Sequence, residues 1–229
     1  MKEYCEDKLG MLTIQRNNSA VSMLRRGRTM NAFHLLSKAC RDVQAARKGD
    51  DRPSYQRTYQ YTWLDCSKAL TTRMEGAIKF NEGTLPFLFL HFLRIKNPLE
   101  CSEEDGSICA RGFVWVLWYN LALVSILLGS PVGAPGIGLL KQSLGLFRLV
   151  QSVVDPQPSS KHWLILKLSI LNNEACVHSE LAQSYESLDR LINMGLELSK
   201  MSDMLDPKEQ ELFLWTVKVM VDDRYAPAA

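Results

Sequence analysis

The sequence predicts a mainly all-α protein built from antiparallel helix hairpins, with an irregular or short-strand insertion in the middle. Three observations favour this fold. Residues 17–48 contain no proline and repeat apolar side chains at three- and four-residue steps, as amphipathic helices do. Residues 112–129 form an uncharged apolar run that fits one long buried helix. Small residues also recur at matching places in three segments.

Helix start and stop signals divide the chain into three hairpins and a last helix. Gly27 and Gly129 each end a predicted first helix, and the proline-rich stretch 155–160 separates the second hairpin from the third. We therefore expect a single helical-repeat domain over residues 1–229. Its parts are predicted as repeat 1 at about 17–48, an insertion at 49–106, repeat 2 at 107–154, repeat 3 at 160–201 and a C-terminal capping helix at 206–223.

Local signals define the insertion and the capping helix. In residues 49–106, large and aromatic side chains occur in short runs cut by glycine and proline, which favours extended or irregular structure. The capping helix begins at Pro207, with Asp206 as the predicted N-cap and Glu209 as its partner in a capping box.

The three predicted hairpins share a pattern of small residues. On the first helices, Asn18, Asn120 and Asn173 are each followed by an alanine two positions later and by a small residue nine positions later. The second helices open with a small residue and carry another small or flexible residue seven positions on. These are Ala32 and Ala39, Ser187 and Met194, and, with four inserted residues, Gly138 and Gly145. Small side chains let helices approach to about 8–10 Å, so we expect these positions at the helix crossings.

This pattern resembles the tetratricopeptide repeat (TPR), a helix–turn–helix unit of α-solenoids, and most of all its asparagine-rich variants. The segments Tyr119–Leu123 (YNLAL) and Leu171–Ala175 (LNNEA) carry the resemblance, with His178 further along the same first helix. The three units cover roughly 105 of the 229 residues. Three departures are the missing closing proline, the longer turn of the second unit and the long insertion after the first unit. The same segments also resemble an uncharacterised algal family without a known activity.

The resemblance implies a non-catalytic scaffold that binds a protein or peptide partner. In such arrays the first helices line the concave face, where an asparagine amide can hold a peptide main chain because it offers a donor and an acceptor. This implies that Asn18, Asn120, Asn173 and His178 contact the partner. The alternative is that each amide bonds to a neighbouring part of its own fold.

Charge is distributed unevenly along the chain. Residues 16–48 carry eight bases and one acid, a net charge of +7, whereas residues 174–223 carry eleven acids and four bases, a net charge of −7. Arg25 and Arg28 stand at the densest basic point, at the predicted turn. They form a rim that can attract an acidic partner, although a solvated helix face is the alternative. No aromatic-rich RNA-binding signature accompanies them, so we do not expect a nucleic-acid partner.

Other functions find less support. No cysteine lies in a C-x-x-C pair, the four histidines are scattered, and no G-x-S-x-G or H-E-x-x-H motif occurs, so we expect no metal, cofactor, small-molecule substrate or catalytic residue. Residues 1–10 are polar and unlike a secretory signal, which predicts free thiols and a cytoplasmic location, with the nucleus as the alternative. A membrane-associated protein anchored by residues 112–129 and an enzyme of unknown class stay open.

Overall fold

The computed structural model describes residues 2–48, 92–93, 113–129, 134–155 and 161–225. Within these ranges the chain forms seven α-helices and one short 3-10 helix, and it contains no strand. The expected all-α class is therefore confirmed for the described residues. The predicted strands of the insertion lie outside them, apart from Phe92 and Leu93, which belong to neither a helix nor a strand.

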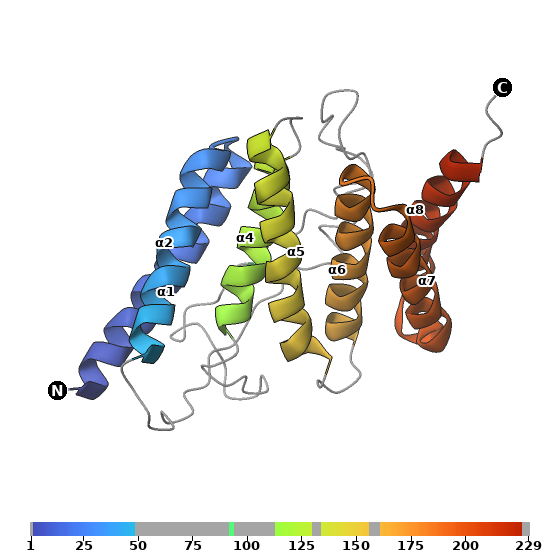
Figure 1. The fold of residues 1–229 in the computed structure, drawn as a ribbon. Helices are drawn as coiled ribbons and strands as arrows, with labels where there is room; N and C mark the ends of the chain where they lie inside the picture. The colour runs from blue at the N-terminus through green and yellow to red at the C-terminus, as the bar shows by residue number, and fades with distance from the viewer. Residues whose placement is uncertain (1, 49–91, 94–112, 130–133, 156–160, 226–229) are drawn as a thin grey trace.

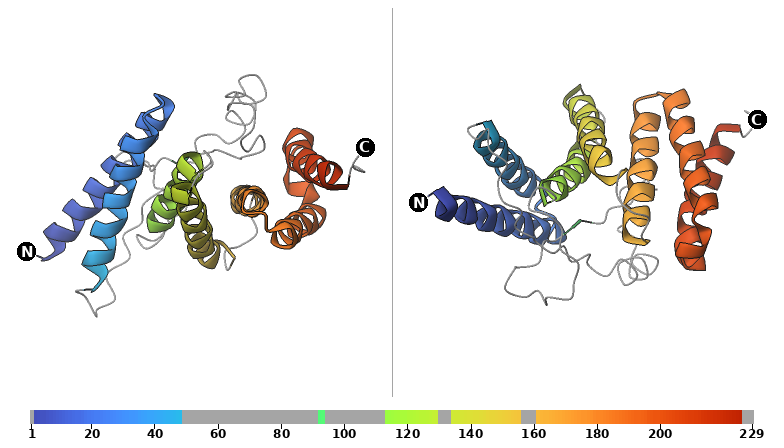
Figure 2. Two further views of the ribbon diagram at one scale, coloured as in Figure 1. Left: turned by 45° about the horizontal axis from the view of Figure 1, so that its top comes forward. Right: turned by 90° about the horizontal axis from the view of Figure 1, so that it is seen from below.

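The helices stand side by side in one row (Figure 1). The pairs α1/α2, α4/α5 and α6/α7 pack as hairpins, while α2 contacts α4, α5 contacts α6 and α8 contacts α7. The first helix, α1, and the last, α8, lie at opposite ends of the row in every view (Figure 2). The helices are α1 (Lys2–Arg25), α2 (Thr29–Lys48), α4 (Phe113–Gly129), α5 (Ala134–Val154), α6 (Lys161–Glu180), α7 (Ser184–Lys200) and α8 (Pro207–Tyr225), with the 3-10 helix Ser202–Met204 before α8.

Two helices begin earlier than the sequence predicts. Helix α1 begins at Lys2 rather than near Asn17, because residues 2–16 contain no proline and bury Ile14 on the core side. Helix α5 begins at Ala134 rather than at Ile137. Its Pro135 lies in the first helical turn, where the missing N–H is tolerated because it would have no partner within the helix.

The small residues of the first and third hairpins lie where the paired helices cross. Ala20 on α1 and Ala32 on α2 are fully buried, as are Ala175 on α6 and Ser187 on α7. The Ser187 hydroxyl also donates a hydrogen bond to the Ala175 carbonyl at 2.9 Å, which joins the two small positions directly. In these two hairpins the predicted close contact is confirmed.

The second hairpin uses a different register, and the prediction for Gly138 and Gly145 is wrong. Both glycines are exposed, and a Cβ atom at either would meet no atom within 4 Å. Gly136 and Ser143 are buried in their place. Gly136 follows Ala122 by 14 positions, against 12 in the other two hairpins, so two residues are inserted rather than four. The presence of glycine in a sequence therefore does not show which face of α5 packs against α4.

The turns of the first and third hairpins have the same geometry. Gly27 has φ +71° and Ala182 has φ +56°. In each case the following residue donates its N–H to the carbonyl five positions earlier, at 3.0 and 2.8 Å, as in a Schellman motif. The second hairpin needs a small residue for another reason. A Cβ atom at Gly129 would lie 2.8 Å from the carbonyl oxygen of Gly136, so a side chain would block this close approach.

Helix α4 is buried almost all round. It contributes to one apolar cluster shared with α5 to α8 and with Ile14 of α1, and to a second cluster shared with α1 and α2. Phe92 and Trp118 pack against both clusters. The apolar run predicted at 112–129 is therefore covered by protein along its described part. Among the described residues, no helix combines the length and the apolar character needed to cross a membrane.

The predicted capping box opens α8. The Glu209 N–H donates to Asp206 Oδ1 at 3.0 Å, and the Asp206 N–H donates to Glu209 Oε2 at 2.9 Å. The backbone hydrogen bond from Glu209 lowers the pKa of Asp206, and Lys161 acts in the same direction. Lys161 also lies 2.9 Å from Glu209 Oε2, which links the start of α6 to the start of α8.

Candidate functional site

Asn120 holds the main chain of Leu93 against α1 and α4. Its Oδ1 accepts the Leu93 N–H at 2.8 Å, and its Nδ2 donates to the Leu93 carbonyl at 2.7 Å and to Asn17 Oδ1 at 2.8 Å. Asn17 Nδ2 donates to the same carbonyl at 2.9 Å. Both amides are fully buried. The Asn120 amide therefore pairs with a main chain, but that main chain belongs to the protein itself, as in the alternative interpretation.

The sequence pattern selects Asn18 on α1, whereas the structure buries its neighbour Asn17. Asn18 is half-buried, and its Oδ1 accepts a hydrogen bond from Asn17 Nδ2 at 3.3 Å. Helical spacing could have found Asn17, because it lies three positions after Ile14 and four before Val21, which are both apolar. A buried amide without hydrogen bonds would lower the stability of the fold. Asn17 is buried, and its contact with Leu93 satisfies its amide.

The predicted partner-binding residues of the third hairpin are also covered. Asn173 is fully buried, and its Oδ1 accepts a hydrogen bond from Asn172 Nδ2 at 3.3 Å. His178 is buried, and its Nδ1 lies 2.7 Å from Oε1 of Gln183, the residue that directly precedes α7. With Asn120, these side chains lie inside the fold, so a partner does not reach them in this arrangement.

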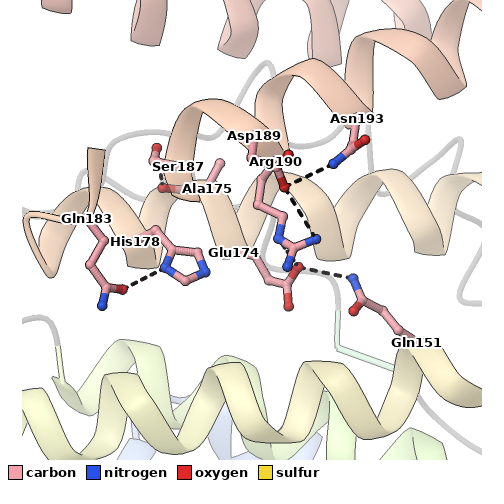
Figure 3. A network of polar contacts seen from close by, with 9 residues as sticks. All are labelled: Gln151, Glu174, Ala175, His178, Gln183, Ser187, Asp189, Arg190 and Asn193. Carbon is pink, nitrogen blue, oxygen red and sulfur yellow. Dashed lines mark hydrogen bonds and ion pairs between the residues drawn. The ribbon is translucent and has the colours of Figure 1, made fainter. Parts of the chain in front are cut away.

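A buried carboxylate that the sequence pattern missed joins α5, α6 and α7 (Figure 3). Glu174 is 1% exposed, and its Oε2 lies 3.1 Å from the Nε of Arg190. Gln151 Nε2 donates to the same oxygen at 3.0 Å. Burial raises the pKa of Glu174 despite these two partners. An acid within the otherwise uncharged run from Leu168 to Val177 was the available signal, because such positions face the core.

The accessible part of the predicted site is the α1–α2 turn. Arg25, Arg26 and Arg28 are all exposed there, and we call these three residues the basic rim. In the part of the chain that the structure describes, none of them forms an ion pair. Arg16 differs, because it is mostly buried and pairs with Asp42. The rim therefore presents three guanidinium groups to solvent within four consecutive positions.

Neither Cys40 nor Cys176 is chemically activated. Cys40 and Cys176 are buried and unpaired by disulfides. Burial raises the pKa of each thiol to about 12, so the reactive thiolate is scarce at neutral pH. Across the described residues, no three or more His, Cys, Asp or Glu side chains are grouped so that they could hold a metal ion.

Comparisons with known proteins find no relative for this chain. No protein-family model matches it, no curated protein matches it, and no solved structure matches it. The resemblance to the TPR and to the algal family therefore rests on the residues quoted above and stays a prediction.

Proposed function

We propose that the protein is a non-catalytic, TPR-like helical-repeat scaffold that binds an acidic protein surface at the basic rim. The single observation that carries this proposal is the exposure of Arg25, Arg26 and Arg28 in one turn. Guanidinium groups clustered in solvent attract carboxylates over several ångströms and pair with them through two parallel hydrogen bonds.

The packing of the helices supports a scaffold role. Three hairpins stand in one row, and each buries a small residue where its two helices cross. Such rows present helix faces and turns as extended binding surfaces. The side of α1 and α4 that carries Asn17 and Asn120 is filled by Leu93, so the accessible turn at the basic rim is the better candidate for a partner.

The experiment compares the proteins that co-purify with three forms of the full chain. They are the natural sequence, Arg25→Glu/Arg28→Glu, and the control Lys141→Glu, which changes an exposed base on α5. Quantitative mass spectrometry is expected to find proteins that the rim variant loses and the control retains, with an acidic segment cross-linked near residue 26. The same protein profile for all three forms, with no cross-link from the rim to an acidic segment of any protein, a second copy of this chain included, would overturn the proposal.

Two alternatives from the sequence stay predictions. Helix α4 contains all but one residue of the proposed membrane anchor at 112–129, and it packs against α2 and α5. The buried pair of Glu174 and Arg190 is a contact between α6 and α7. The cytoplasmic or nuclear location is likewise an expectation.

A further inference from the structure

Helix α7 leaves a line of large apolar side chains in solvent. Tyr185, Ile192 and Leu196 are 81%, 54% and 50% exposed. They are spaced by seven and four positions, so they lie along one helix face, and we call them the α7 stripe. The buried residues of α7, such as Ser187 and Leu191, lie on the opposite face. The stripe is therefore separate from the core contacts of this hairpin.

Helices α2 and α5 are the second helices of the other two hairpins. At the positions that match Ile192 and Leu196, they carry polar or small residues. The buried small residues set the register between hairpins. Ile192 then corresponds to Ser37 on α2 and Lys141 on α5, and Leu196 corresponds to Arg41 and Gly145. Of these, Arg41, Lys141 and Gly145 are exposed. Apolar side chains at these two positions are thus a feature of the last hairpin, and exposed apolar groups of this kind mark contact surfaces.

The turn beside the α7 stripe is acidic, whereas the matching turn of the first hairpin is basic. Glu180, Glu186 and Asp189 are exposed around the start of α7. In the shared register Glu180 corresponds to Arg25, and Tyr185 corresponds to Met30, which is 53% exposed. Each end of the row therefore places an exposed apolar side chain beside charges, and the charges at the two ends have opposite sign.

We propose that the α7 stripe and its acidic turn bind the basic rim and Met30 of a second copy of this chain. This rests on the proposed function and names the acidic partner of the rim. The first and third hairpins lie at opposite ends of the row, so one copy cannot join its own two surfaces (Figure 1). A contact between two different surfaces leaves one of each free, and the chains associate head to tail.

The test uses one variant for each surface, in the full chain. The rim variant is Arg25→Glu/Arg28→Glu and the stripe variant is Ile192→Glu/Leu196→Glu. Leu149→Glu is the control, because Leu149 is an exposed apolar side chain on α5. Circular dichroism checks that each variant keeps its helices. Analytical ultracentrifugation then measures mass from micromolar to submillimolar concentration at low and high salt.

We expect the natural chain and the control to rise above the monomer mass of 26.0 kDa with concentration, and less so at high salt. Each surface variant alone should stay a monomer, with a dissociation constant raised about 100-fold. An equal mixture of the two variants should form a one-to-one complex that grows no further, because one intact rim meets one intact stripe.

Three results would overturn the inference. They are a natural chain that stays monomeric throughout, a closed dimer that both surface variants retain, and a mixture that remains monomeric while the natural chain associates. None of these depends on the co-purification experiment. A monomeric chain whose rim variant still loses a specific acidic protein would retain the proposed function and reject self-association alone.

Discussion

The first and third hairpins correspond residue by residue, yet they differ in how much of each is buried. Ala20 and Ala175 are 155 positions apart, and the same separation relates Leu36 to Leu191 and Gly27 to Ala182. The first two pairs are buried in both hairpins, and the last pair has the same left-handed turn conformation. The contact within each hairpin is therefore the same.

The difference lies on the side of the first helix that a preceding hairpin can cover. Ser19 on α1 is exposed, whereas its counterpart Glu174 on α6 is buried against Gln151 of α5. Helix α5 packs on α6, and no helix of the described chain precedes α1. Burial within a hairpin thus follows from its own sequence, and burial between hairpins follows from position in the row.

The largest expected effect comes from filling the small contact shared by both hairpins. We expect Ala32→Leu and Ser187→Leu each to lower the free energy of unfolding by about 3 kcal/mol, because the added side chain must separate two packed helices. Urea unfolding measures the loss. Gly145→Ala is the control, and it should gain up to about 1 kcal/mol because its Cβ meets open space and alanine favours helix. A tolerated leucine at either site would show that the two contacts differ.

The buried amides come next in size. Asn17→Ala should lower the free energy of unfolding by about 2 kcal/mol, because it removes a donor from the Leu93 carbonyl and an acceptor from Asn120. Asn18→Ala should lower the free energy of unfolding less than Asn17→Ala does, because Asn18 is half-buried. The matching pair Asn172 and Asn173 is buried at both positions, so both alanine variants should be costly there. Equal losses at positions 17 and 18 in urea unfolding would contradict this difference between the hairpins.

The sequence predicted what depends on local spacing. The all-α class, the turn at Gly27 and the capping box of Asp206 and Glu209 each follow from residues a few positions apart. The buried alanines of the first and third hairpins also followed, because these two hairpins share one spacing between their small residues.

The remaining features depend on contacts between distant segments. Leu93 is 76 positions from Asn17 and 27 from Asn120, so nothing in the local pattern of either asparagine indicates their shared main-chain partner. The register of the second hairpin depends on the close approach of α4 to α5 at Gly129. Two extra residues between Ala122 and Gly136 shift this register relative to the other hairpins. Glu174 likewise accepts a hydrogen bond from Gln151, which comes from another hairpin.

The two matching turns allow a smaller, paired test. Gly27→Ala should lower the free energy of unfolding by about 1 kcal/mol, because a Cβ atom is strained at positive φ. Ala182→Gly should raise it by about 0.5 kcal/mol, since the strain released is partly offset by the greater freedom of glycine in the unfolded chain. Thermal and urea unfolding measure both. The same sign for both substitutions would show that the turns are not equivalent.

The smallest expected effect concerns how stability depends on pH. Glu174 can contribute to this dependence, whereas its counterpart Ser19 carries no charge. Burial raises the pKa of Glu174 more than Arg190, Gln151 and Arg148 lower it, and Asp155 raises it further. Between the ordinary glutamate pKa and this raised value, the folded protein binds more protons than the unfolded chain. Stability from this group is therefore present at low pH and is lost as the pH rises through that interval.

Glu174→Gln removes this dependence while keeping the size of the side chain. We expect the variant to match the natural chain in acid and to be more stable at neutral pH by less than about 1 kcal/mol, because a neutral side chain avoids the cost of a buried charge. Urea unfolding over a pH series measures the difference between the two proteins. Glu186→Gln, at an exposed position on the same hairpin, is the control and should show no such trend. A variant that instead loses stability at neutral pH would mean that pairing with Arg190 outweighs burial, so that the third hairpin gains stability from the charge that the first one lacks.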